Sequence, residues 1–188
     1  MKVVIIGGAG YIGSHVVLEA VDRGYDVTVF DDLSTGFERN IDNKVRFING
    51  STKSTSDLSK LFKMDSYEAV IHLAASKAAG ESMLEPVIYA RNNIIGGQNV
   101  INACSDCNIK IIIFSSSAAV YGLPKYNLID ESHPLSPTNY YGQTKLQIEE
   151  SLEWFSKLKG IKYASLRYFN AAGYDLKKRV KRLNQLRK

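Results

Sequence analysis

The chain has 188 residues, of which 45% are apolar and 23% are charged. This length fits one ordinary domain with a sizeable core, and the composition excludes wholesale disorder. The formal net charge of +5 comes from residues 177–188, which hold seven basic residues and no acidic one. The remaining residues carry 17 basic and 19 acidic side chains, so the body of the protein is mildly acidic.

The first residues form an apolar run, 3–6, that leads directly into glycines. A secretory signal would need a longer apolar region and a small-residue cleavage site, so we interpret this run as the first strand. No stretch of the sequence is long and apolar enough to span a membrane, which predicts no membrane partner and a cytoplasmic protein. Cys104 and Cys107 form a C-x-x-C pair without the further ligands that a zinc site needs. We therefore expect no metal and two ordinary thiols.

Short β-branched runs alternate with helical stretches along the chain. Helices are predicted over residues 11–23, 56–63, 86–107 and 138–159. Strands are predicted to start at Val3, Val27, Val45, Ala69, Ile111 and Tyr163. Several of them are continuously apolar, which is typical of strands buried on both faces. The alternation predicts an α/β domain with a Rossmann-like doubly wound parallel sheet of about six strands and helices on both faces.

A glycine loop follows the first predicted strand and opens a helix. Gly7, Gly10 and Gly13 have the spacing G-x-x-G-x-x-G, which lets backbone N–H groups and the helix dipole approach a pyrophosphate. Asp31, 18 residues after Gly13, begins an acid pair with Asp32 at the end of the second strand. A carboxylate there suits a ribose diol and repels a 2′-phosphate, so the pattern favours NAD over NADP. The alternative is a structural glycine turn without a ligand.

Candidate catalytic residues lie near the ends of two later elements. The run Ser115–Ser117 closes the fifth strand, and Tyr141 and Lys145 lie one helical turn apart. A phenol with a pKa of about 10 needs roughly 4 kcal/mol of selective stabilisation to act as a base at neutral pH. A lysine ammonium and a positive nicotinamide could supply it, while a serine hydroxyl holds the substrate oxygen. The alternative is a surface Tyr–Lys pair.

Taken together, these motifs resemble the N-terminal, NAD-binding part of the UDP-glucose 4-epimerases, which are extended short-chain dehydrogenases/reductases. The resemblance covers nearly all of residues 1–174, and its motifs occur in the family's order. The segments that carry it are 7–15, 71–82, 92–93, 114–122, 141–145 and 166–173. Dehydratases of related type have an Asp-Glu pair where this chain has Ala118 and Ala119, so the resemblance favours an epimerase.

The resemblance implies roles for individual residues. Ser117, Tyr141 and Lys145 match the catalytic triad, in which the phenolate takes the proton of the sugar 4-hydroxyl while a hydride passes from C4 to NAD. The expected substrate is a UDP-sugar, contacted by Ser117, Tyr141 and Asn170. The expected NAD contacts, besides Gly7, Gly10, Gly13, Asp31 and Asp32, are Tyr11, Ile12, Ala74, Ala75, Lys77, Asn93, Tyr141, Lys145 and Phe169.

Two departures from the family pattern affect these expectations. Gly50-Ser51-Thr52 stands where the family usually has Gly-Asp, an aspartate that reaches the adenine amino group. A serine there lowers the expected NAD affinity modestly. We also expect the chain to lack most of the C-terminal substrate lobe, with an NAD-binding domain over residues 1–174 and a basic tail over 175–188. The chain alone is then expected to be a weak or inactive epimerase.

Other functions remain open from the sequence. One is a noncatalytic NAD-binding module or truncated remnant, and another is a different extended short-chain enzyme acting on a nucleotide sugar. Nucleic-acid binding through the basic tail is disfavoured because no aromatic residue interleaves the cations, and a solvated terminus is the simpler interpretation. The helix face with Trp154, Leu152, Phe155 and Leu158 fits either a homodimer or the core of one subunit.

Overall fold

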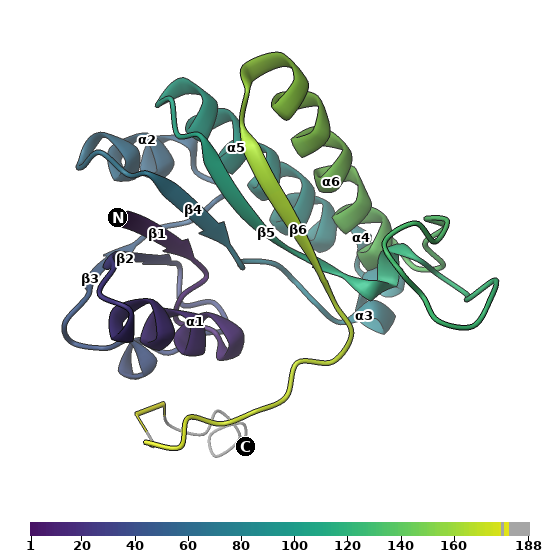
Figure 1. Ribbon diagram of the computed structural model, residues 1–188, viewed down its shortest axis with the longest axis horizontal. Helices are drawn as coiled ribbons and strands as arrows, with labels where there is room; N and C mark the ends of the chain where they lie inside the picture. The colour runs from purple at the N-terminus through teal and green to yellow at the C-terminus, as the bar shows by residue number, and fades with distance from the viewer. Residues whose placement is uncertain (178, 181–188) are drawn as a thin grey trace.

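The computed structural model describes residues 1–177, 179 and 180, and a parallel sheet forms its centre (Figure 1). The strand order is β3-β2-β1-β4-β5-β6, and each strand begins within one residue of its predicted start. The strands are β1 (Lys2–Ile6), β2 (Asp26–Asp31), β3 (Arg46–Asn49), β4 (Ala69–His72), β5 (Ile111–Ser117) and β6 (Lys162–Tyr168). The predicted doubly wound sheet is therefore confirmed, with its order reversing between β1 and β4.

Three of the four predicted helices are found close to their predicted bounds. Predicted helices correspond to α1 (Tyr11–Asp22), α2 (Thr55–Lys63) and α6 (Tyr140–Lys159). Asn139 caps α6 by accepting the Gly142 N–H at 2.9 Å, so α6 begins two residues later than predicted. Gly160, with φ +68°, ends α6 as predicted. Short 3₁₀ turns, η1 (Glu38–Asn40) and η3 (Ala118–Val120), lie in the connections.

The prediction of one uniform α-helix over residues 86–107 is wrong in its middle. The segment divides into α4 (Pro86–Tyr89), a π-helical stretch η2 (Ala90–Ile95) and α5 (Gly96–Asp106). A further helix, α3 (Ala79–Leu84), precedes it and has no counterpart among the predicted helices. Wider π-helical turns are frequent at functional sites, and this one contains Asn93.

Two apolar clusters show which helices cover which face of the sheet. On one face α2, α5 and α6 pack on the strands, through residues that include Leu61, Ile101 and Leu152. On the other face α1 packs over β1 and β2 through Val17 and Ala20. Helices on both faces are thus confirmed, and the carboxyl ends of the strands are left for the candidate site.

Cys104 lies on the buried face of α5, where burial raises the pKa of its thiol, whereas Cys107 is exposed at the end of the helix. Both thiols are free. Among the described residues, no helix has the length and apolar character needed to cross a membrane. Within the same residues, no group of three or more His, Cys, Asp or Glu side chains could hold a metal ion.

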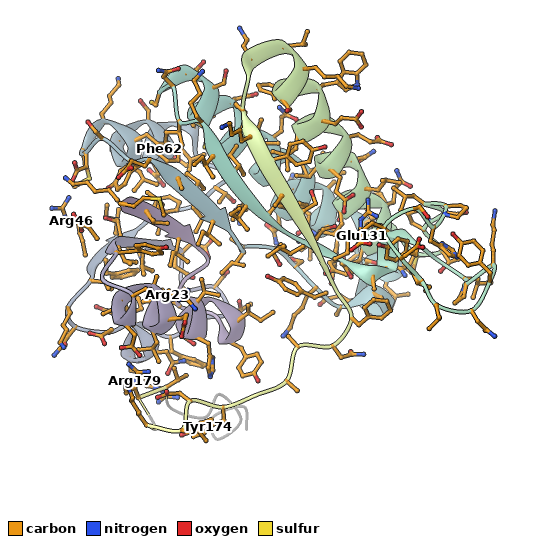
Figure 2. The ribbon with its side chains drawn as sticks, viewed as in Figure 1. Arg23, Arg46, Phe62, Glu131, Tyr174 and Arg179 are labelled. Atoms are coloured by element: carbon orange, nitrogen blue, oxygen red, sulfur yellow. The ribbon has the colours of Figure 1, made fainter. Side chains whose placement is uncertain are left out.

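The basic tail lies partly outside the described residues, at 178 and 181–188. Its described part is solvated at Lys177, which is exposed, but not at residues 179 and 180. Val180 is 2% exposed, and the Arg179 guanidinium donates to Asp22 at the end of α1 at 2.9 Å and to Asp175 at 3.0 Å. Figure 2 shows Arg179 beside α1, with Tyr174 on the same C-terminal segment further from the helix. The domain boundary after residue 174 stays a prediction.

Candidate active site

The glycine loop joins β1 to α1, and its three glycines differ in what surrounds them. A Cβ at Gly7 would lie 2.5 Å from the Ala74 nitrogen, and one at Gly13 would lie 2.0 Å from the Gly7 oxygen. These two positions therefore permit close backbone packing. A Cβ at Gly10 would meet only the Gly7 oxygen, at 3.4 Å. Gly10 is also the N-cap of α1 without a side-chain hydrogen bond, so the open space beside it adjoins a positive helix end that fits a pyrophosphate.

Asp31 and Asp32 lie at the end of β2, beside the glycine loop. The Asp31 carboxylate accepts the Ala9 N–H and the Leu33 N–H, both at 2.9 Å. Burial raises the pKa of Asp31, although these two hydrogen bonds oppose the effect. Because each oxygen accepts one hydrogen bond, lone pairs remain for a ribose diol. Asp31 thus fixes the loop and keeps accepting capacity for a ligand.

Asp32 interacts with the serine that replaces the family's aspartate. The Ser51 hydroxyl donates to an Asp32 oxygen at 3.2 Å, and Lys53 Nζ lies 3.9 Å from the same oxygen. Burial would raise the pKa of Asp32, but the hydrogen bonds from Ser34 and Ser51 and the charge of Lys53 lower it overall. The Ser51 hydroxyl therefore uses its proton on Asp32, and its lone pairs remain available as acceptors.

The loop after β4 contributes Ala74, Ala75 and Lys77, and Asn93 holds it in place. The Asn93 carbonyl oxygen accepts the Ser76 N–H at 2.8 Å. Its amide donates to the Ser76 carbonyl and to Thr144 Oγ1, both at 3.0 Å. Ala74 and Ala75 are half-buried and Lys77 is exposed. Asn93 thus connects this loop to α6, and both donors of its amide are used within the chain.

Tyr141 and Lys145 lie on α6 and face the end of β5. Lys145 is 3% exposed, and its ammonium donates to the Ser115 carbonyl at 2.7 Å. It also lies 4.9 Å from the centre of the Phe114 ring and 5.8 Å from that of Tyr141. Burial lowers the pKa of Lys145 to about 7, against the opposing charge of Glu149. The candidate catalytic residues Tyr141 and Lys145 are therefore brought together at the end of β5.

The expected lowering of the Tyr141 pKa is not found in the chain by itself. Burial raises the pKa of the phenol, and a side-chain hydrogen bond with Ser117 only partly offsets this rise. The Ser117 oxygen also accepts the Ala119 N–H at 3.1 Å, which holds the serine at the start of η3. The prediction placed the lysine charge against the phenolate, whereas here the ammonium donates to a backbone carbonyl. A phenolate therefore needs charge beyond this arrangement.

Two features that position Tyr141 were missed in the sequence. The Ser82 hydroxyl on α3 accepts the Tyr141 N–H at 3.0 Å, which fastens the start of α6. Tyr89 is fully buried and meets the Tyr141 ring edge-on, with the ring centres 6.4 Å apart. Burial and Glu81 raise the pKa of Tyr89 to about 12, so this phenol stays neutral. Ser82 is the last residue of the segment 71–82 that carries the family resemblance, and this membership is the sequence feature from which its role could have been suspected.

The segment after β6 leads back to the glycine loop. Phe169 is 65% exposed and Asn170 is exposed, directly beyond the strand residue Tyr168 that pairs with Ser117. The Tyr11 hydroxyl then donates to the Gly173 carbonyl at 2.5 Å. Residues 169–173 therefore run from the triad side of the sheet edge to the start of α1, where Tyr11 and Ile12 are half-buried.

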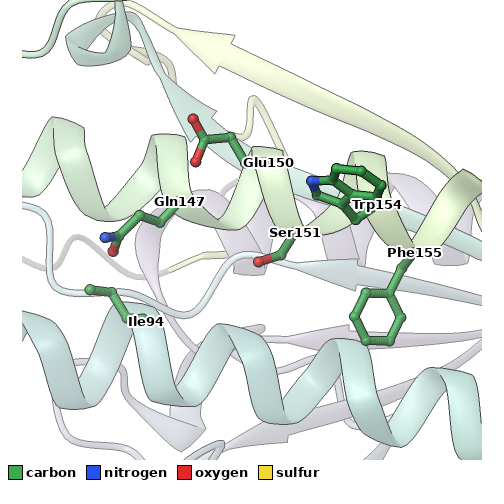
Figure 3. Close-up of a pocket in the computed structure, with 6 residues that line it drawn as sticks. All are labelled: Ile94, Gln147, Glu150, Ser151, Trp154 and Phe155. Atoms are coloured by element: carbon green, nitrogen blue, oxygen red, sulfur yellow. The ribbon is translucent and has the colours of Figure 1, made fainter.

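A separate groove of about 500 Å³ lies between η2 and α6, away from the triad (Figure 3). Trp154 is 60% exposed beside it, and Leu158 is 71% exposed one turn further along α6. Leu152 on the same helix is fully buried. Core packing within one subunit is therefore wrong for Trp154 and Leu158 and correct for Leu152. The groove is lined by Ile94, Gln147, Glu150, Ser151, Trp154 and Phe155.

Residues 3–186 match the NAD dependent epimerase/dehydratase family. The chain belongs to this family. A UDP-glucose 4-epimerase from Lactobacillus helveticus is 47% identical over 173 residues, which are 92% of this chain and 52% of that protein. One from Halalkalibacterium halodurans is 42% identical over 180 residues, 96% of this chain and 54% of the relative. The predicted resemblance is thereby confirmed.

Solved structures of the epimerase/dehydratase family share this fold. A UDP-glucose 4-epimerase from Brucella ovis in complex with NAD superposes with a TM-score of 0.92 at 38% identity, over 95% of this chain and 55% of that one. A UDP-glucose 4-epimerase from Thermotoga maritima with UDP-glucose gives a TM-score of 0.86 at 35% identity, over 89% and 55%. The chain thus spans about half the length of the relatives it matches.

Proposed function

We propose that this chain is the NAD-binding and catalytic part of a nucleotide-sugar epimerase of the UDP-glucose 4-epimerase type. The observation that carries the proposal is the convergence of Ser117, Tyr141 and Lys145 at the carboxyl end of β5. The names of the most similar relatives support this reaction in preference to other reactions of nucleotide sugars. The intact triad favours an enzyme over a noncatalytic module.

The glycine loop and its neighbours fit NAD. The open space at Gly10 and the N-terminus of α1 suit a pyrophosphate, and the free lone pairs of Asp31 suit a ribose diol. The further contacts in this proposal come from Tyr11, Ile12, Ala74, Ala75, Lys77, Asn93, Tyr141, Lys145 and Phe169, together with Gly7, Gly13 and Asp32. NAD bound there would supply an acceptor for the hydride of sugar C4 and return that hydride.

The chain's own residues then move the proton. Tyr141, as a phenolate, takes the proton of the sugar 4-hydroxyl, and Ser117 donates to the same oxygen to hold it in place. A protonated Lys145 at 5.8 Å from the Tyr141 ring stabilises the phenolate by about 3 kcal/mol at an effective dielectric constant near 20. This corresponds to about two pKa units, less than the shift a neutral-pH base needs. The remainder must come from the bound ligands.

The substrate in this proposal is a UDP-sugar, with Asn170 beyond β6 as a contact to it in addition to the triad. Because the chain spans about half the length of its relatives, we expect weak or no epimerase activity from it alone. Contacts to parts of a substrate remote from the reacting atoms normally contribute to turnover as well as to affinity.

We further propose a homodimer through the exposed apolar side chains of α6. Trp154 and Leu158 expose most of their surface beside a groove that a second copy could cover. Large exposed aromatic side chains are enriched at protein interfaces, where they contribute much of the binding energy.

Calorimetric titration of the purified chain with NAD tests the proposed function. We expect saturable binding to the wild type and at least tenfold weaker binding to Gly10→Val. Binding to Lys63→Gln should be unchanged, because Lys63 ends α2, which packs on the face of the sheet opposite α1. Absence of NAD binding to the folded wild type would refute the proposal. Conversion of UDP-galactose to UDP-glucose, measured in parallel, should be slow in the wild type and absent in Tyr141→Phe.

A further inference from the structure

Three consecutive serines of β5 each interact with a different side chain of α6. The Ser115 carbonyl accepts from Lys145 Nζ at 2.7 Å, and the Ser117 side chain lies close enough to Tyr141 to oppose the rise in the pKa of that phenol. Between them, the Ser116 hydroxyl donates to a carboxylate oxygen of Glu149. Because the three α6 residues are spaced by four, one helix face is fastened to the end of one strand. The middle contact belongs to neither the proposed triad nor the cofactor site.

Glu149 also forms an ion pair with Arg167 of β6. The Arg167 guanidinium donates to the Glu149 carboxylate through Nη2 at 2.7 Å and through Nε at 3.1 Å. Arg167 lies directly opposite Ser116 in the β5–β6 register, so the two partners of Glu149 are neighbours in the sheet. The Glu149 and Arg167 side chains are only 7% and 19% exposed. Because the ion pair is mostly buried and joined by several hydrogen bonds, the Glu149 carboxylate and the Arg167 guanidinium have little freedom to move.

Arg167 also contacts the loop between β5 and α6. Arg167 Nη1 donates to the Tyr121 hydroxyl at 3.1 Å, and Tyr121 is 4% exposed. Tyr121 directly follows η3, which starts after Ser117. One guanidinium therefore connects β6, α6 and the segment that leaves Ser117.

The charges of Glu149 and Arg167 also affect the protonation of Lys145, which lies on the same helix as Glu149. Glu149 lies one helical turn beyond Lys145, and its negative charge favours the ammonium. The groups that face Lys145 are His72 of β4, Tyr141 and Glu149 of α6, and the Ser115 carbonyl of β5. Burial and the charge of Lys145 lower the pKa of His72 to about 3, so His72 is neutral and Glu149 is the only anion in this set. Arg167 partly cancels that anion.

We propose that Glu149 and Arg167 are positioning residues that fasten α6 to the end of β5 and together set the charge state of Lys145. The meaning of this pair for catalysis rests on the proposed function, whereas its effect on Lys145 does not. Removing the anion should disfavour the ammonium, and removing the cation should favour it. A pair with a packing role alone has no reason to produce effects of opposite sign.

The experiment measures the pKa of Lys145 in the full chain from the ¹³Cε chemical shift of lysine, assigned with Lys145→Arg. In Glu149→Gln we expect the Lys145 pKa to fall by about one unit, and in Arg167→Met to rise by about as much. Arg167→Lys keeps the cation but not the bidentate contact, so its Lys145 pKa should stay near that of the wild type. If Arg167→Met fails to fold, Arg167→Gln, which also removes the cation but keeps a polar side chain, is measured in its place.

Shifts of the same sign in Glu149→Gln and Arg167→Met, or no shift in either of these two variants, would overturn the proposal. NAD titration of the same proteins separates the two inferences. If the wild type does not bind NAD but the opposite shifts are observed, the proposed function fails and the role of the pair toward Lys145 stands. If NAD binds and the shifts are absent, the proposed function stands and the role of the pair toward Lys145 fails.

Discussion

Gly13 offers the sharpest test of how the glycine loop is built. A Cβ at this position would lie 2.0 Å from the Gly7 oxygen and 2.8 Å from the Gly8 Cα, and both are backbone atoms. Since ordinary contacts of a Cβ begin near 3.4 Å, Gly13→Ala forces α1 and the end of β1 apart by more than 1 Å. Overpacking typically costs 1–3 kcal/mol, and a clash with backbone belongs at the upper end, so we expect about 3 kcal/mol.

For a chain of this size, 1 kcal/mol shifts Tm by about 2–4 °C, so Tm of Gly13→Ala should fall by about 6–12 °C. Thermal unfolding followed by circular dichroism measures this without any ligand. The matched control is Gly80→Ala in α3, where a Cβ would meet nothing within 4 Å and where alanine favours the helix. A Tm of Gly13→Ala equal to that of the control would refute the close packing of the loop.

Three further predictions concern other residues of the site and surface. The pKa of Lys145 is about 7 in the folded chain against an ordinary 10.5, so the unfolded chain binds more protons between these values and stability rises with pH there. Lys145→Met should therefore stabilise the chain by up to about 5 kcal/mol at pH 6, with the gain shrinking by pH 10, as measured by urea unfolding at both pH values. Asp31→Asn places an amide donor against the N–H of Ala9 or Leu33, so it should lower the free energy of unfolding by about 1–3 kcal/mol and weaken NAD binding. An unchanged NAD affinity in calorimetry and an unchanged free energy of unfolding would contradict this. Trp154→Glu should remove self-association in sedimentation experiments without changing the unfolding midpoint of the monomer, because the side chain is 60% exposed.

Much of the fold could be predicted because its signals are local. Continuous apolar runs such as Ile111–Phe114 identified buried strands to within a residue, and Gly160 marked the end of α6. The same holds for the glycine loop, whose spacing between a strand and a helix is readable along the chain. The four-residue spacing of Tyr141 and Lys145 correctly placed them on one helix face.

What could not be predicted depends on residues far apart in the sequence. Nothing near Glu149 in the chain indicates that its partners are Ser116 and Arg167, 33 and 18 residues away. The helix α3 is too short to show an amphipathic period, and its role follows from a contact with Tyr141 59 residues later. Likewise, the anchoring of Arg179 on Asp22 spans 157 residues.

The sequence by itself determined the order of strands and helices along the chain, the glycine loop and the uneven distribution of charge. These follow from periodicity, spacing and composition, which act over a few residues. Only the tertiary structure decided the protonation preferences of Lys145 and Tyr141, the exposure of Trp154 and the position of the segment around Arg179. A pKa and an exposed fraction depend on which groups surround a side chain in space, and packing sets those surroundings.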